Sequence, residues 1–229
     1  MDGPNIAIII QARMNSSRLP GKILMDIGGA PLLAHLIRRV KTSKLSDHVV
    51  VATTDQSIDD LVEGVCINEG VSVFRGSEQN VLERMILASK SVNADAIVRI
   101  TADNPFVNGE LVDLVLRRFL ETYPNIDYAS NTEKSGFPFG LFVEVVKMSS
   151  LIKVNENNPS PAQMEHVTIS FRSNSNSYNV CNVKTELNFG DLLLSVDTIE
   201  DYIRVCPLFD QLIKINPYFG LSDITKLVK

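Results

Sequence analysis

The stretch Ile6-Ala7-Ile8-Ile9-Ile10 decides the fold that this sequence predicts. Five consecutive apolar residues, four of them β-branched, are typical of a strand buried on both faces of a parallel sheet. A polar, glycine-containing loop follows from Gln11 to about Ile27, and apolar residues then recur at helical spacing from Leu32 to Val40. The chain therefore begins as strand, loop and helix, which is how an α/β fold begins.

The same alternation of short apolar strands and amphipathic helices continues through the first half of the chain. Asp55 or Ser57 could cap a helix that ends near Val65, and Ser77 could cap the next, which ends near Val92. Together these elements predict an α/β fold of three layers, an α/β/α sandwich around a mostly parallel, Rossmann-like sheet. The further strands are expected at His48–Thr53, Val71–Phe74 and Ala96–Thr101, and a further helix at Glu110–Glu121.

After about Asn125 the alternation of strands and helices becomes irregular. The sequence shows no internal repeat, so we expect a single domain over residues 1–229 in which about 125–190 forms a lobe or dimerisation arm. Strands are expected at Asp127–Asn131, Phe142–Lys147, Tyr178–Leu187 and Leu192–Val196, and helices at Ala162–Phe171 and Thr198–Ile213.

Composition narrows the classes of function. The 229 residues carry 22 basic and 27 acidic side chains, and this net charge of −5 argues against a nucleic-acid partner, because phosphate contacts need a basic face. The run Ile6–Ile10 is far shorter than the ~20 apolar residues that span a bilayer, so no membrane partner is expected. Cys66, Cys181 and Cys206 are odd in number and lack metal-ligand spacing, which favours a reducing, cytoplasmic location.

The loop after the first strand carries three cations within ten residues of an otherwise acidic chain. It leaves the carboxyl end of the strand, where open α/β sheets bind their ligands. Small residues such as Ser16 and Gly21 let backbone N–H groups approach an anion, and guanidinium groups match phosphate oxygens. The loop is not a Walker A motif, because Ile23 stands where that motif has Ser or Thr. Either a triphosphate site or a solvated basic loop fits its three cations, Arg13, Arg18 and Lys22.

Two aspartates follow expected strands. Asp103 comes after Ala96–Thr101, and Asp197 comes after Leu192–Val196. Carboxylates at strand ends can meet beside a phosphate chain and hold Mg²⁺, which prefers oxygen ligands. The alternatives are that Asp197 caps the following helix and that Asp103 belongs to a turn before Pro105.

The segment Ile9-Ile10-Gln11-Ala12-Arg13-Met14-Asn15-Ser16-Ser17-Arg18-Leu19-Pro20-Gly21-Lys22 closely resembles the start of sugar nucleotidyltransferases that use CTP. These are the CMP-KDO synthetases, the acylneuraminate cytidylyltransferases and especially the spore-coat polysaccharide synthesis F-type proteins. Further matches follow in the family's order, at residues 51–55, 73–77, 99–105, 165–168 and 196–201.

The resemblance implies a nucleotide-diphospho-sugar transferase fold and the transfer of CMP from CTP to an acidic sugar, KDO- or nonulosonate-like, for polysaccharide or glycan biosynthesis. It implies Mg²⁺ on Asp103 and Asp197, and charge neutralisation by the loop cations during release of pyrophosphate. Related enzymes are commonly homodimers. The candidate nucleotide contacts are Ala12, Arg13, Ser16, Arg18, Lys22, Arg75, Ser77 and Thr101, of which Arg75 could be a plain surface residue and Ser77 a plain helix cap.

On the acceptor side the resemblance points to Glu144, Glu165 and His166. Phe142 stands where the spore-coat-type pattern has an aspartate, and an aromatic ring cannot accept hydrogen bonds from hydroxyls or bind a metal. A solvated Glu144 and a structural His166 are the plainer interpretations. Two other functions stay open. One is a nucleotidyltransferase acting on a sugar phosphate or phosphonate, and the other is a non-catalytic nucleotide-binding protein of polysaccharide assembly.

Overall fold

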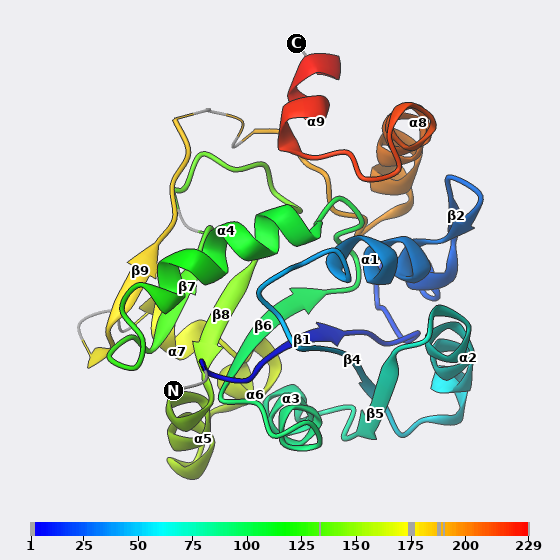
Figure 1. Ribbon diagram of the computed structural model, residues 1–229. Helices are drawn as coiled ribbons and strands as arrows, with labels where there is room; N and C mark the ends of the chain where they lie inside the picture. Colours follow the sequence, from blue (N-terminus) through cyan, green and yellow to red (C-terminus); the bar gives the residue numbers. More distant parts are fainter. Residues whose placement is uncertain (1–2, 133, 174–176, 187–188, 190, 229) are drawn as a thin grey trace.

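The computed structural model describes residues 3–132, 134–173, 177–186, 189 and 191–228. Within them seven strands form one sheet in the order β5-β4-β1-β6-β8-β7-β9 (Figure 1). Neighbours pair in parallel except β8, which runs antiparallel to β6 and β7. The expected mostly parallel sheet is confirmed. Its strands are β1 (Ile6–Gln11), β4 (His48–Thr54), β5 (Ser72–Gly76), β6 (Ala96–Thr101), β7 (Tyr128–Ser130), β8 (Glu144–Lys147) and β9 (Val180–Asn182).

The central strand β1 is buried on both faces, as its sequence requires. Ile6, Ile8 and Ile10 belong to one hydrophobic core, and Ala7 and Ile9 belong to the other. Because side chains alternate along a strand, the same five residues anchor both layers of helices. The last residue of β1, Gln11, pairs with Ala52 and Thr101, so the carboxyl ends of β1, β4 and β6 lie at one edge of the sheet.

Helices cover both faces of the sheet (Figure 1), which confirms the three-layer prediction. Among the described residues no helix is long and apolar enough to cross a membrane. The first core receives α1 (Leu32–Val40), α2 (Asp60–Glu69), α4 (Gly109–Leu120), α8 (Ile199–Ile215) and α9 (Leu221–Leu227). The second receives α3 (Val81–Lys90), α5 (Met148–Glu156) and α7 (Ile169–Ser173), and α6 (Pro161–His166) lies beside α3. Short elements complete the chain: the 3₁₀ turns η1 (Lys22–Leu24) and η2 (Ser57–Asp59), and the hairpin of β2 (Asp26–Ile27) and β3 (Ala30–Pro31).

Several expected helix boundaries are wrong. Asn80 rather than Ser77 caps α3, because its side chain accepts from the N–H of Glu83. The helix expected at 162–171 is interrupted at Val167, whose φ of 37° lies in the left-handed region that β-branched residues avoid. Helices α5 and α9, of nine and seven residues, were not expected from the sequence.

The strands expected in the second half are shorter in the structure. Of the strand expected at Tyr178–Leu187 only Val180–Asn182 pairs within the described residues, and Leu187 lies outside them. The stretch Leu192–Val196 is extended but touches another strand-like segment through one bridge, between Leu193 and Phe139. Residues 125–190 add β7, β8 and β9 to the main sheet, so this segment continues the domain; its dimerisation role stays a prediction.

Candidate functional site

The loop between β1 and η1 is fixed by hydrogen bonds at Met14. The Met14 carbonyl accepts from the N–H groups of Ser16 and Gly21, at 3.0 and 2.8 Å. Gly21 has a φ of 74°, which a residue with a side chain adopts only with strain. These contacts fold the loop back on itself and bring its cations to the carboxyl edge of the sheet.

A buried carboxylate, Asp59, anchors this loop from outside. Its Oδ1 accepts from the Met14 N–H at 2.7 Å, and its Oδ2 accepts from the N–H and hydroxyl of Thr54 at the end of β4. The residue is 1% exposed. Sequence reasoning missed Asp59, because an acidic residue at the start of a helix is usually interpreted as a cap, and here the side chain caps nothing.

Three parts of the chain meet in one cluster of ion pairs. Lys22 Nζ lies 2.8 Å from Asp103 Oδ2 and 2.8 Å from Asp197 Oδ1. Arg18 Nη2 lies 2.8 Å from the same Asp197 oxygen. The backbone supports this arrangement, since the N–H of Val196 donates to the Asp103 carbonyl at 2.9 Å. Sequence reasoning expected the two aspartates to meet, and the structure brings them together around one lysine.

The carboxylate of Asp197 is free of helix capping. Thr198 caps α8 in a capping box with Asp201, and Asp201 Oδ2 also accepts from the N–H of Asp197 at 3.1 Å. Burial alone would raise the pKa of Asp201. Hydrogen bonds from Arg204 and from the N–H groups of Thr198 and Asp197 outweigh burial and hold this pKa below its usual value. The capping alternative for Asp197 is therefore wrong, and its side chain points to the cations instead.

A cleft of about 240 Å³, the charged cleft, opens beside this cluster. Eight of the residues singled out from the sequence line it: Arg13, Ser16, Arg18, Lys22, Thr101, Asp103, Glu165 and Asp197. Thr101 donates its hydroxyl to Asp103 Oδ1 at 2.6 Å and fixes that carboxylate. Gln11, the last residue of β1, also lines the cleft and was missed, although a polar residue that ends a buried strand is a usable signal.

A further cation lies beneath the loop and was not expected. Arg84 on α3 is fully buried and donates to the carbonyl of Ser77. Burial, together with the nearby Arg13, lowers its pKa to about 10, so the guanidinium stays charged at neutral pH. The buried Arg84 thus adds to the positive charge of the loop's own cations, which favours an anionic ligand.

Five candidate residues lie outside the charged cleft: Ala12, Arg75, Ser77, His166 and Glu144. Ala12 is buried and donates its N–H to Ala52 O at 3.2 Å. Arg75 is paired with Asp60 and Glu63, and the hydroxyl of Ser77 accepts from the N–H of Asn80. His166 ends α6 with an exposed side chain. The three nucleotide contacts among these, and the acceptor contact of His166, stay predictions.

Glu144 was expected at the acceptor, but the structure gives its carboxylate a buried network instead. It is paired with Arg99 and accepts hydrogen bonds from Tyr128 and Thr168, each at 2.6 Å. Burial alone would raise the pKa of Glu144, but Arg99 and the two hydroxyl donors hold it below its usual value. Burial and this carboxylate raise the pKa of Tyr128. Arg99 also donates to Gln11 Oε1 at 3.0 Å, so Glu144 reaches the charged cleft only through Arg99.

The two aspartates of the charged cleft fit a divalent cation as shared ligands. No group of three or more His, Cys, Asp or Glu within the described residues could hold a metal on its own. The ammonium of Lys22, however, lies between the Asp103 and Asp197 carboxylates, so a cation is accommodated there. Mg²⁺ commonly takes one or two carboxylates and completes its shell with phosphate oxygens and water. This donor set therefore suits Mg²⁺ held jointly by protein and substrate.

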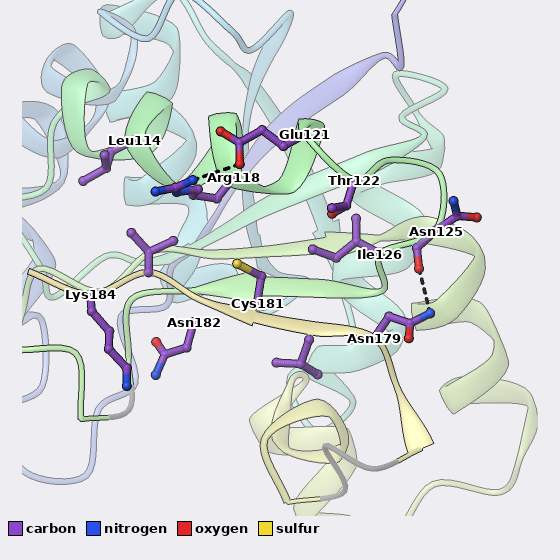
Figure 2. A pocket seen from close by; sticks show the side chains of 12 residues that line it. Leu114, Arg118, Glu121, Thr122, Asn125, Ile126, Asn179, Cys181, Asn182 and Lys184 are labelled. Atoms are coloured by element: carbon purple, nitrogen blue, oxygen red, sulfur yellow. Dashed lines mark hydrogen bonds and ion pairs between the residues drawn. The ribbon is translucent and has the colours of Figure 1, made fainter.

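A larger cleft lies elsewhere on the molecule. It measures about 730 Å³ and runs between α4 and β9, over Ile126 and Cys181 (Figure 2). The one carboxylate among its described lining residues, Glu121, is paired with Arg118 at 3.0 Å. None of the candidate nucleotide, metal or acceptor residues lines it, so the chemistry of the charged cleft, and not cleft size, identifies the functional site.

The fold and the charged cleft define a nucleotidyltransferase, and comparison with known proteins identifies its family. A sequence model described as Cytidylyltransferase matches residues 7–227. The chain therefore belongs to the cytidylyltransferase family and is an enzyme of the nucleotidyltransferase class. This confirms the resemblance that the first loop indicated.

Individual relatives agree. The chain is 37% identical over 214 residues to the spore coat polysaccharide biosynthesis protein SpsF of Bacillus subtilis, covering 90% of this chain and 87% of that protein. A cytidylyltransferase structure from Leptospira borgpetersenii superposes with a TM-score of 0.92 at 32% identity, covering 98% of this chain and 94% of that one. A CMP:2-keto-3-deoxy-manno-octonic acid synthetase in complex with CTP gives a TM-score of 0.69 at 19% identity and coverages of 90% and 99%, which shows a shared fold alone.

Proposed function

We propose that this cytidylyltransferase transfers CMP from CTP to a hydroxyl of an acidic sugar, KDO- or nonulosonate-like, for polysaccharide or glycan biosynthesis. One observation carries the proposal: the cations of the first loop converge with Asp103 and Asp197 in a single cleft. A triphosphate brings about four negative charges to that cleft, and clustered cations are the groups that offset them. The name of one relative, a spore coat polysaccharide biosynthesis protein, supports a role in polysaccharide biosynthesis, and a 3-deoxy-manno-octulosonate cytidylyltransferase that is 32% identical over 120 residues supports a sugar-acid acceptor.

The reaction is an in-line displacement at the α-phosphorus of CTP. The sugar hydroxyl oxygen bonds to that phosphorus, and the bond from the α-phosphorus to the oxygen that bridges it to the β-phosphorus breaks. Pyrophosphate leaves with the electron pair, and the proton of the hydroxyl passes to solvent. Arg13, Arg18 and Lys22 bind the phosphate oxygens and offset the charge that develops on pyrophosphate. Mg²⁺ on Asp103 and Asp197 would supply further charge neutralisation. Positioning and electrostatics suffice, and no covalent intermediate is needed.

The acceptor hydroxyl needs a hydrogen-bond partner within the cleft. Glu165 lines the cleft at the end of α6, and the structure gives it no ion pair with another described residue. Its carboxylate is therefore available to accept from a sugar hydroxyl. We assign acceptor contact first to Glu165 and then to His166, its neighbour in the chain.

Calorimetric titration with CTP, ATP, GTP and UTP, each with and without Mg²⁺, tests the nucleotide half of the proposal. We expect binding that prefers CTP and depends on Mg²⁺, and that weakens at least tenfold in Asp103→Ala. Equal binding of the four nucleotides would contradict it, and CTP binding without metal dependence would favour a non-catalytic nucleotide-binding protein. Pyrophosphate release with sugar acids, compared with a sugar phosphate and a phosphonate, then identifies the class of acceptor.

Cytoplasmic location and a homodimer complete the proposal. Within the segment expected to form the dimerisation arm, the apolar residues Phe137 and Leu141 are core residues at 4% and 1% exposure and offer no partner face. The dimer is therefore proposed on the family resemblance alone. Light scattering at micromolar concentration should give twice the mass of the chain, and a monomer would contradict this part of the proposal.

A further inference from the structure

A third cleft, of about 500 Å³, is lined by two aromatic side chains and is called here the aromatic cleft. Phe139 and Phe142 line it, with their rings perpendicular and their centroids 5.2 Å apart. Phe139 is 44% exposed, which is unusual for a phenylalanine. Two rings set edge to face form adjacent apolar walls, against which an apolar part of a ligand can pack.

The backbone that carries these rings is tightly held. Asn131 is fully buried, and its amide donates to Leu141 O at 2.8 Å and accepts from the Val143 N–H at 2.7 Å, so the residues on both sides of Phe142 are fixed. Phe139 exchanges backbone hydrogen bonds with the segment at Leu192–Leu194, at 3.0 and 2.7 Å. The aromatic cleft is therefore a built feature of the fold.

The aromatic cleft lies at the same edge of the sheet as the charged cleft. Strand β8 runs antiparallel to β6, and Glu144 pairs with Arg99, so the chain passes Phe142 at the carboxyl edge just before it enters the sheet. On the other side, Leu193 is bridged to Phe139 and lies four residues before Asp197. Four extended residues span at most about 14 Å, which is comparable with the length of a large sugar acid.

Charge favours an anionic occupant. Lys134 and Lys184 line the aromatic cleft with exposed side chains, against one glutamate, Glu186. Neither lysine forms an ion pair within the described part of the chain. Two lysines against one glutamate give the described lining residues a net positive charge, and beside an apolar wall such a charge attracts a ligand that is both acidic and partly apolar.

We propose that Phe139 and Phe142 form the distal half of the acceptor site and select a sugar acid that carries an apolar substituent, such as an acyl group, at the end remote from the reacting hydroxyl. This inference rests on the proposed cytidylyl transfer and adds the class of acceptor to it. The rings pack against the substituent, while the two lysines draw the anion toward the cleft. Because Phe142 borders the sugar rather than the nucleotide, it determines specificity without binding CTP.

The test measures pyrophosphate release with CTP, Mg²⁺ and two probe acids: N-acetylneuraminate, which carries an acyl group, and KDO, which has none. Burying one methyl-sized group is worth about fourfold in affinity, and an acetyl group between two rings is worth about tenfold. We expect the unmodified enzyme to prefer the acylated acid at least tenfold in kcat/KM. Phe142→Asp should lower the ratio of kcat/KM for the acylated acid to that for KDO at least fivefold. Phe142→Leu, which keeps an apolar side chain, should lower this ratio less than threefold.

Titration with CTP separates the possible failures. If the enzyme and Phe142→Asp bind CTP alike but KDO is used as well as the acylated acid, the inference is overturned and cytidylyl transfer stands. The inference is also overturned if Phe142→Asp leaves the preference unchanged, or if neither acid is used while CTP is bound. Loss of selective CTP binding by the unmodified enzyme would overturn the proposed function itself.

Discussion

The charged cleft and the aromatic cleft lie at one edge of one sheet, yet they are held in opposite ways. In the charged cleft, ion pairs join residues as distant in sequence as Arg18 and Asp197. In the aromatic cleft, the buried amide of Asn131 holds the backbone, while Phe139 is exposed and Phe142 is half-buried. The difference indicates two demands on the fold: phosphate chemistry needs charges held at fixed places, whereas acceptor choice needs a surface whose side chains can change without disturbing those charges.

The largest effect should come from the carboxylates of the charged cleft. Asp197→Ala removes one of two shared metal ligands, leaves Arg18 unpaired and leaves Lys22 with Asp103 as its one remaining carboxylate within the described residues, so kcat for pyrophosphate release should fall about 10³-fold. The measurement is initial rate against Mg²⁺ concentration. Glu200→Gln, an exposed change on the first turn of α8, is the control and should stay within twofold of the unmodified enzyme. A similar loss in both variants would mean that α8, and not the Asp197 carboxylate, is what the rate depends on.

The second effect concerns Glu144, which lies between the two clefts. Glu144→Gln leaves Arg99 buried and uncompensated, which should cost about 3–5 kcal/mol of unfolding free energy at neutral pH. Because the folded-state pKa of Glu144 is lowered, its contribution is complete above the usual glutamate pKa of 4.5 and is lost as the pH falls below it. Urea unfolding at pH 7 and near pH 3.5 should therefore show the gap between enzyme and variant narrowing in acid.

An exposed ion pair provides the matched control for Glu144. Glu121 is paired with Arg118, and both side chains are more than half exposed, at 56% and 57%. Glu121→Gln should change the unfolding free energy by less than about 1 kcal/mol, since exposed pairs contribute little. Equal costs in the two variants would contradict the buried network.

The third effect tests the backbone of the aromatic cleft. Gly140 has a φ of 97°, and an added Cβ would lie 2.4 Å from the N atom of Ser195. Gly140→Ala should cost about 2–4 kcal/mol, from the left-handed backbone and the steric overlap together. Gly29→Ala shares the positive φ, at 84°, but its Cβ would meet nothing within 4 Å, so about 1 kcal/mol is expected. The difference in unfolding free energy between the two variants, measured by thermal unfolding, gives the cost of the steric overlap alone. Equal losses of stability would mean that Leu194 and Ser195 move away from the added Cβ without cost.

These two clefts also differ in how far the sequence could predict them. The continuous apolar run Ile6–Ile10 and the helices that follow it show clear local periodicity. The ends of the four parallel strands β1, β4, β5 and β6 were therefore predicted to within two residues. Because parallel strands end at a common edge, Arg13, Lys22 and Asp103 could be placed together before their contacts were known.

Prediction failed where tertiary contacts override local pattern. Leu192–Val196 has the composition of a strand, yet a single bridge to Phe139 is all the pairing it finds. Glu144 alternates with Phe142 like an exposed strand residue, but Arg99, Tyr128 and Thr168 bury its charge from three other elements. No local pattern reports partners that lie 16 to 45 residues away.

The smallest effect should come from Asp59, which anchors the loop of the charged cleft but does not itself line the cleft. Asp59 holds the loop through the Met14 N–H at 2.7 Å without lining the cleft. Asp59→Asn keeps the shape but replaces one acceptor oxygen by a donor, so either Met14 or Thr54 loses its partner. The loop then loosens, and the KM for CTP should rise about tenfold with kcat changed less than threefold, because the carboxylates that act in the reaction are untouched.

Asp60→Asn is the neighbouring control, since Asp60 is 64% exposed and is paired with Arg75 rather than with the loop. If CTP binding depends on the loop anchor Asp59 and not on Asp60, the KM of Asp60→Asn for CTP should stay within twofold of that of the unmodified enzyme. Should Asp60→Asn raise the KM as much as Asp59→Asn, the ion pair of Arg75 would matter to the nucleotide, and the predicted contact between Arg75 and the base would gain support. The pair of variants thus decides whether the charged cleft extends across β4 to β5 or ends at the first loop.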